Sequence, residues 1–125
     1  MLRLGGLATG SAVFTIFLPQ ETMAAVHQGL GLGAFPEAPL TGYLTRSLSA
    51  MYAFHGLILW CLSRDVVGYR RILVPVAWAT LAMGVLLLGI DLHSDMPKWW
   101  TWIEGPGVAG FGVLLVGLTR HLERP

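Results

Sequence analysis

The stretch ILVPVAWATLAMGVLLLGI at residues 72–90 decides the fold class of this chain. It contains no charged side chain and is about as long as the ~20 residues that a helix needs to cross the hydrocarbon core of a bilayer. Arg71 precedes it and Asp91 follows it, so charges bound the apolar run at both ends. The stretch therefore predicts a transmembrane helix.

Three further apolar runs occur at residues 4–18, 48–62 and 105–119. Each reaches a bilayer-spanning length by taking in flanking polar or aromatic residues. Hydrocarbon offers no partners to backbone N–H and C=O groups, and a helix satisfies these groups within one segment. We therefore expect an all-α integral membrane protein, a four-transmembrane-helix up-and-down bundle that forms a single domain over residues 1–125.

The overall composition favours the membrane class. Of the 125 residues, 54% are hydrophobic and 12% are charged, and the mean hydropathy is +0.64, far from the values of a soluble domain. The lipid bilayer is therefore the expected partner. Nucleic acid is not expected as a partner, because a formal net charge of +1 provides no basic field to attract it. The one cysteine, Cys61, excludes an internal disulfide and is interpreted as a packing residue.

Charged residues are distributed unevenly between the two expected sides of the membrane. One side holds Arg3, Arg64, Arg70, Arg71, Arg120 and Arg124. The other side has the cations Arg46 and Lys98 and collects the acidic residues Glu21, Glu37, Asp91, Asp95 and Glu104. Because cytoplasmic segments carry the excess of Lys and Arg, we expect a bacterial inner-membrane protein with both termini in the cytoplasm.

The connection at residues 19–40 lies on the outer side. Met23, Val26 and Leu30 fall near helical spacing within it, which predicts a short interfacial helix in the first outer loop. That helix is expected to end at the following glycines, Gly29, Gly31 and Gly33. An alternative for the first apolar run is a secretory signal with its cleavage site at residues 23–25; a retained span is favoured.

Arg46 stands inside the second apolar helix, in GYLTRSLSAMYAFHG at residues 42–56. An ionisable side chain there is costly unless it is paired or reaches water. We expect a buried ion pair of Arg46 with Asp91 or Glu104, and an anchor for an anionic ligand is the alternative. A face of small residues follows Arg46 along the helix and predicts close helix packing: Ser49, Ala53 and Gly56.

His55 lies near the middle of the second span, which makes it a candidate axial ligand for haem. Ligation by two histidines of one chain requires a second histidine at equal depth. The other histidines lie at the membrane boundaries: His27, His93 and His121. A packing role for His55 is therefore favoured over cofactor binding.

Asp91, His93 and Asp95 form a candidate metal site at the end of the third span. In extended backbone all three point the same way, whereas on a continuing helix the two aspartates share a face and His93 turns away. His27, Glu21 and Glu104 could add ligands from the same membrane side. A solvated helix cap and turn next to Pro97 is the favoured interpretation, and both geometries stay open.

Aromatic residues mark the start of the fourth span. Trp99, Trp100 and Trp102 are typical of an interfacial belt, and Lys98 can extend to lipid phosphates. Glu104 is expected to begin the last helix and to cap its free amides, with Pro106 in the first turn. In the first span, residues 6–10 form a GxxxG element that permits close helix packing, within the chain or between chains.

The EGPG motif at residues 104–107, the RSLSAMYAFHG stretch at residues 46–56 and the layout of helical hairpins carry a resemblance. Together they resemble small bacterial inner-membrane proteins of the domain-of-unknown-function type. That resemblance implies a four-helix membrane fold and supplies no activity or ligand.

The sequence predicts a non-catalytic accessory or structural subunit, alone as a homo-oligomer or within a larger membrane complex, that needs no cofactor. The alternative is a membrane protein that binds a metal, haem or small ligand at its outer face, with or without catalysis. A third possibility is a small transporter in which Arg46 and Asp91 or Glu104 line a path.

Overall fold

A computed structural model describes residues 1–121, which form six α-helices and no strand. The helices are α1 (Leu2–Gly10), α2 (Val13–Ile16), α3 (Gln20–Gly29), α4 (Pro39–Leu62), α5 (Arg70–His93) and α6 (Lys98–His121). The all-helical prediction is confirmed. In this part of the chain, α5 and α6 are long and apolar enough to cross a membrane. Crossing by the α1–α2 segment and by α4 stays a prediction.

The chain divides into two compact units, Met1–Arg64 and Asp65–Pro125. The first unit contains α1 to α4, and the second contains α5 and α6. Because the helices fall into two compact units, a single four-helix domain stays a prediction. Arg124, one of the cations used to orient the chain, lies outside the described residues.

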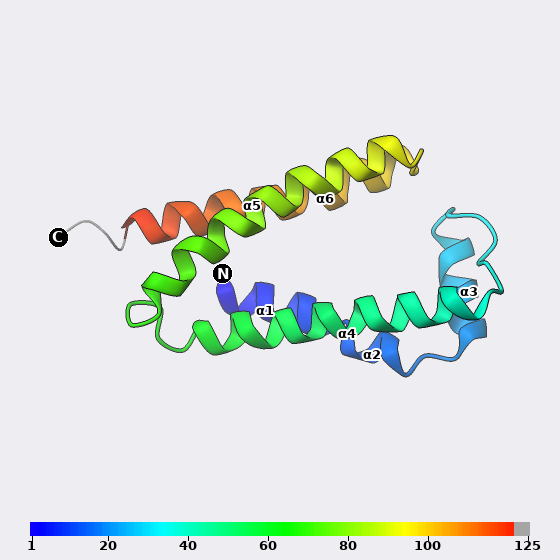
Figure 1. Ribbon diagram of the computed structural model, residues 1–125, viewed down its shortest axis with the longest axis horizontal. Helices are drawn as coiled ribbons and strands as arrows, with labels where there is room; N and C mark the ends of the chain where they lie inside the picture. The colour runs from blue at the N-terminus through cyan, green and yellow to red at the C-terminus, as the bar shows by residue number, and fades with distance from the viewer. Residues whose placement is uncertain (122–125) are drawn as a thin grey trace. The chain divides into compact units, whose positions relative to one another are not determined.

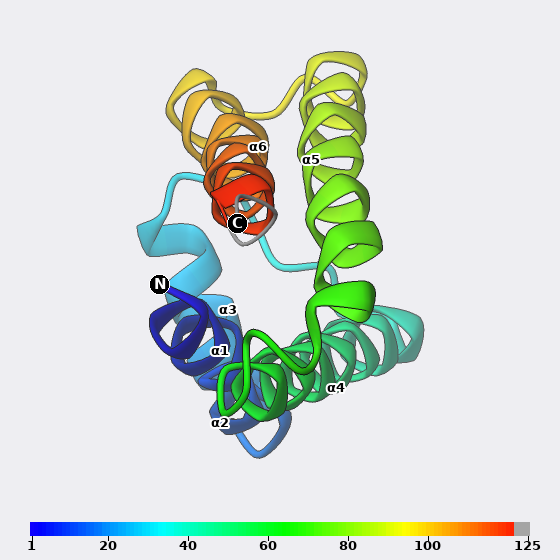
Figure 2. The same cartoon turned by 90° about the vertical axis from the view of Figure 1, so that its left-hand side faces the viewer.

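The second unit is an antiparallel hairpin in which α5 and α6 lie side by side along their length (Figure 2). Three glycines set how the two helices align. At each of them the backbone of the facing helix lies where a side chain would otherwise be. A Cβ at Gly84 would lie 2.2 Å from the amide nitrogen of Ala109, and one at Gly112 would lie 2.5 Å from that of Leu81. A Cβ at Gly105 would meet Leu88 at 2.7 Å. Glycine is therefore required at each crossing point.

Larger residues pack where the glycines end. Towards the open end of the hairpin the buried side chains are Leu73 and Ala77 of α5 with Leu115 and Val116 of α6. Pro75 and Pro106 lie inside these helices and leave one backbone carbonyl each without its usual donor, a defect that membrane helices tolerate. The hairpin interior thus changes from glycine at one end to branched side chains at the other.

The first unit is also built on a glycine contact, between antiparallel α1 and α4 (Figure 1). A Cβ at Gly6 would lie 2.9 Å from the carbonyl oxygen of Gly56, and one at Gly56 would lie 2.3 Å from the amide nitrogen of Gly10. The GxxxG element therefore packs within the chain, on the small-residue face predicted for α4. Only the backbone of Gly10 takes part, because a Cβ there would point into open space.

The first apolar run is not one continuous α-helix. It is divided into α1 and α2, and between them the amides of Ala12 and Phe14 donate to carbonyls three residues back instead of four. Ser11 Oγ donates to the Ala8 carbonyl at 2.7 Å, a local bond that competes with regular helix geometry. The run then ends at Phe17, the C-cap of α2.

The predicted short helix within residues 19–40 is confirmed as α3, whereas its place on the outer side of a membrane stays a prediction. It ends at Gly29, and Gly31 (φ 73°) and Gly33 (φ 85°) occupy left-handed conformations that favour glycine. The second long helix begins at Pro39, earlier than the apolar run from residue 48 indicated, with proline in the first turn where its missing N–H costs nothing.

We expect Gly84→Ala to destabilise the α5–α6 hairpin and Gly89→Ala to leave it intact. Both changes give the same gain in helix propensity, up to about 1 kcal/mol, but only the Cβ at position 84 would meet backbone; position 89 is open. Overpacking of this kind costs about 1–3 kcal/mol. Thermal unfolding in detergent micelles measures the difference, and equal melting temperatures for the two variants would contradict the glycine contact.

Candidate functional site

Asp91 and His93, two residues of the predicted metal site, lie in the last turn of α5 and have helical geometry. The helix runs through His93, so Asp91 and His93 point in different directions. His93 is exposed, and Asp95 is exposed in the turn with φ 50°. Among residues 1–121, His, Cys, Asp and Glu side chains form no group of three or more that fits a metal ion. The metal hypothesis therefore gains no support from geometry.

Asp91 is buried, with 4% of its surface exposed. It lies on the face of α5 that carries Gly84, and continuing the hairpin register places it level with Thr101, which is also buried. Its backbone carbonyl accepts a hydrogen bond from the amide of Met96 at 3.3 Å. Its side-chain Oδ2 is enclosed and has no hydrogen-bond partner. A buried carboxylate oxygen without a donor is costly.

Arg46 has a structural partner that the sequence did not indicate. Its Nε donates to the carbonyl of Ile16 at 3.2 Å and its Nη2 donates to the carbonyl of Leu18 at 3.1 Å. Ile16 is the last residue of α2 and Leu18 follows it by two residues. Carbonyls at a helix end receive no hydrogen bond from an amide of the same helix. The planar guanidinium therefore caps α2 from a neighbouring helix. The guanidinium also passes close to Gly42, where a Cβ atom would lie 3.1 Å from Nη1 of Arg46.

The predicted ion pair joins residues of different units. Arg46 belongs to the first unit, whereas Asp91 and Glu104 belong to the second. The pair stays a prediction. Within each unit, Arg46 and Glu104 have hydrogen bonds of their own, and Asp91 Oδ2 has none.

Glu104 does not begin the last helix, and the prediction that it caps the helix is wrong. Helix α6 begins at Lys98, so Glu104 and Pro106 lie inside it. The helical spacing of four instead brings Glu104 next to Trp100, whose indole Nε1–H donates to Glu104 Oε2. Trp99 packs edge-on against Trp100, with ring centroids 5.4 Å apart and planes 72° apart.

These tryptophans and the glutamate border a groove of about 200 Å³ on α6. Its lining consists of Trp99, Trp100, Ile103 and Glu104. Trp102 lies elsewhere on the helix and is 70% exposed. The groove joins two aromatic rings to one carboxylate, a combination suited to a cation.

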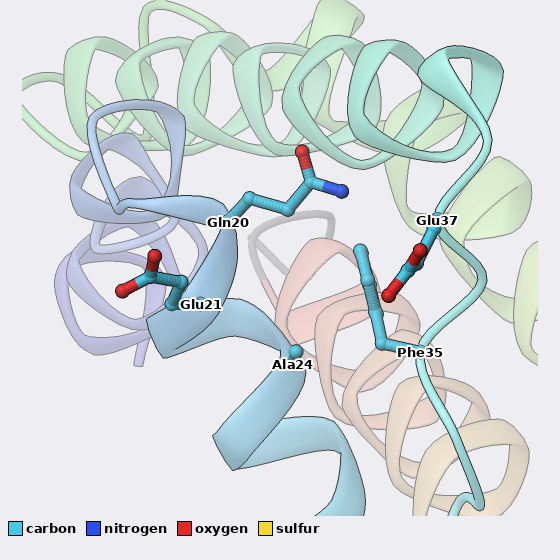
Figure 3. Close-up of a pocket in the computed structure, with 5 residues that line it drawn as sticks. All are labelled: Gln20, Glu21, Ala24, Phe35 and Glu37. Carbon is cyan, nitrogen blue, oxygen red and sulfur yellow. The ribbon is translucent and has the colours of Figure 1, made fainter.

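A second pocket, of about 340 Å³, lies in the first unit between α3 and the segment that leads to α4 (Figure 3). In Figure 3, Phe35 and Glu37 of that segment face the first turns of α3, which carry Gln20, Glu21 and Ala24. The pocket is open and both glutamates are exposed. Its lining was not anticipated from the sequence.

His27 orders this outer segment. Its Nδ1–H donates to the carbonyl of Gly33 at 3.1 Å, and its ring packs edge-on against Phe35 with centroids 5.4 Å apart. Because a carbonyl only accepts, the hydrogen bond fixes the Nδ1–H tautomer of neutral His27. His27 thus has a structural role in the loop.

His55 is half-buried in α4 beside Gly56. Within residues 1–121 its side chain forms no hydrogen bond or ion pair. The structure places no other histidine of the first unit near the middle of α4, since His27 lies in α3. The haem hypothesis for His55 is neither strengthened nor contradicted.

One missed feature had a sequence signal and another had none. Pro97 stands immediately before a helical run, a typical helix start, and beginning α6 there places Trp100 and Glu104 four residues apart on one face. The partner of Arg46 could not be found in this way, because it depends on where the first helix is interrupted.

Arg46→Lys is expected to loosen the end of α2. A lysine keeps the charge but cannot offer the guanidinium fork to two carbonyls, and hydrogen bonds from charged groups contribute about 1.5–3 kcal/mol each. Hydrogen exchange in micelles should be faster for amides of residues 12–18. Arg64→Lys, at an exposed arginine of the same unit, is the control, and equal exchange in both variants would refute the capping role.

Asp91→Leu is expected to stabilise the α5–α6 hairpin by about 1–3 kcal/mol, because it removes an enclosed oxygen that lacks a donor. Thermal unfolding in micelles is the measurement, with Asp95→Asn as control, because asparagine tolerates the left-handed conformation of that exposed turn residue. A loss of stability that disappears in an Arg46→Gln background would instead establish the predicted ion pair.

Comparisons of the chain with models of protein families, with curated proteins and with solved structures found no match. The resemblance to small inner-membrane proteins stays a prediction, and the functional argument depends on the residues of this chain alone.

Proposed function

We propose that this chain crosses the bacterial inner membrane four times and serves as a non-catalytic accessory or structural component of a membrane assembly. The observation that supports this proposal is the inverted distribution of apolar side chains. The closest contacts between helices are made by glycines, and a few leucines such as Leu59, Leu73 and Leu115 are buried, but most large apolar side chains are exposed.

Exposed apolar residues occur on every long helix and on the α1–α2 segment. Among them are Leu7, Phe14, Phe17, Leu48, Met51, Phe54, Met83, Val85, Leu86, Val113 and Leu114, each more than half exposed. A surface of this kind is unfavourable in water and favourable against lipid chains or apolar partner helices. It is therefore suited to a protein whose environment is the bilayer and its neighbouring proteins.

The distribution of charged residues supports the proposed orientation of the chain in the membrane. The turn between α4 and α5 contains Arg64, and Arg70 and Arg71 begin α5. The connection between α5 and α6 contains Asp95 and no cation. With the cationic turn in the cytoplasm, α5 leads outward and α6 leads back.

A second candidate, the binding of a small ligand at the outer face, is favoured by the groove that Trp99, Trp100 and Glu104 border. It is compatible with an accessory role, because accessory membrane proteins also bind lipids.

The topology is tested by placing single cysteines in exposed loops of a chain in which Cys61 is replaced by serine. Four spans place Glu37→Cys and Asp95→Cys outside and Val67→Cys inside. A membrane-impermeant maleimide added to intact cells should label the first two at once and the third only after permeabilisation. If only α5 and α6 cross, Glu37→Cys and Val67→Cys will be labelled from the same side.

The accessory role is tested on the same membranes. After extraction in a mild detergent, the native mass of the protein, corrected for bound detergent, is expected to exceed the 13.6 kDa of one chain by at least one further subunit. Extraction in a harsh detergent should reduce it to one chain. A monomer in both detergents contradicts the role in an assembly.

A further inference from the structure

The groove on α6 brings four side chains of one helical face together. Trp99 and Ile103 are four residues apart, as are Trp100 and Glu104, so the two pairs form adjacent rows along the first turns of the helix. The groove is open to the surroundings, and its volume of about 200 Å³ is small. It is sufficient for the polar end of a lipid headgroup and insufficient for a large cofactor.

The electrostatics of the groove favour a cation. Each indole presents a negative face, and the edge-to-face packing of Trp99 on Trp100 holds the two faces at different angles. Glu104 adds a carboxylate that accepts the indole N–H of Trp100 through Oε2, and this hydrogen bond increases the electron density of that ring. Within residues 1–121, Oε1 of the same carboxylate receives no hydrogen bond.

These groups select a primary ammonium. A quaternary ammonium would use the indole faces only, whereas a primary ammonium also donates an N–H to Oε1 of Glu104. Lys98 is exposed at the first residue of α6, immediately before Trp99 in sequence, and is the cation of this turn of the helix. A ligand that carries an ammonium and a phosphate a few bonds apart matches both charges.

We propose that the groove of Trp99, Trp100, Ile103 and Glu104 binds a phosphoethanolamine group, with the ammonium between the indoles and Glu104 and the phosphate at Lys98. The inference rests on the proposed function, because crossing of the membrane by α6 places its first turns at the depth of the headgroups. The lipid phosphatidylethanolamine is the expected source of the group, and soluble phosphoethanolamine is the other source with this chemistry.

The test uses the full chain in nanodiscs of equal parts phosphatidylethanolamine, phosphatidylcholine and phosphatidylglycerol. Native mass spectrometry of the released protein counts the lipids that stay bound. The wild type should retain phosphatidylethanolamine with about a tenfold preference over the other two lipids. Trp100→Leu and Glu104→Gln should each reduce that preference about tenfold, the range of one cation–π contact or one charged hydrogen bond.

Two matched controls separate the groove from a general effect of tryptophan or charge near the membrane. Trp102→Leu removes a tryptophan outside the groove, and Asp95→Asn neutralises an exposed carboxylate in the preceding turn. Both should keep the wild-type preference. Circular dichroism in micelles verifies the fold of every variant, and Trp99→Leu replaces Trp100→Leu if the latter fails to fold.

The possible results have different consequences. Equal retention of the three lipids by a wild-type chain that inserts and spans overturns the headgroup site and leaves the proposed function standing. Failure of α6 to cross the membrane in the cysteine experiment overturns both. A preference that Trp102→Leu or Asp95→Asn removes as strongly as Glu104→Gln also overturns the site.

The two sources of the group are distinguished with soluble phosphoethanolamine and detergent-solubilised protein. Binding that Glu104→Gln abolishes, at affinities comparable with the lipid, supports the groove and identifies a free ligand. Binding of the lipid alone supports the groove and identifies the bilayer as the source.

Discussion

The close approach of helix backbones at glycine is the contact on which the rest of the structure depends. At Gly84, Gly105 and Gly112 the neighbouring helix occupies the space that a side chain would need. In the first unit the backbone of α1 occupies the corresponding space at Gly56. Lipid chains are as apolar as leucine, so burial of large side chains gives little net driving force for helix association in a bilayer. Dispersion contacts between closely spaced backbones supply it instead. In both units glycines lie at the closest helix contacts, a few leucines such as Leu59, Leu73 and Leu115 are buried, and most large apolar side chains are exposed.

Closely packed helices leave little room for polar side chains between them. Two of three such side chains have hydrogen-bond partners. The guanidinium of Arg46 satisfies carbonyls at the end of α2, where an apolar environment would provide no donor. Glu104 accepts the indole N–H of Trp100, which joins the two side chains in one hydrogen-bonded pair. Asp91 is the exception, since its Oδ2 is enclosed without a donor.

The closed end of the α5–α6 hairpin therefore differs chemically from the rest of the second unit. Asp91 is enclosed beside the turn, Asp95 is exposed in it, and Glu104 lies with two indoles on the first turns of α6. Carboxylates next to aromatic rings attract cations, whereas the arginines near the other end of the hairpin attract anions. The two ends of the same hairpin are thus suited to different charges.

Hydropathy and spacing in the sequence alone determined the helical class, the long α5, the short α3 with its glycines, and the GxxxG element of α1, whose packing partner the sequence left open. These features depend on local chain geometry, which short-range patterns encode. Tertiary structure decided the rest. The carbonyl partners of Arg46 and the enclosure of Asp91 depend on which backbone a neighbouring helix presents. Glycines distant in sequence set how closely the helices of each unit approach.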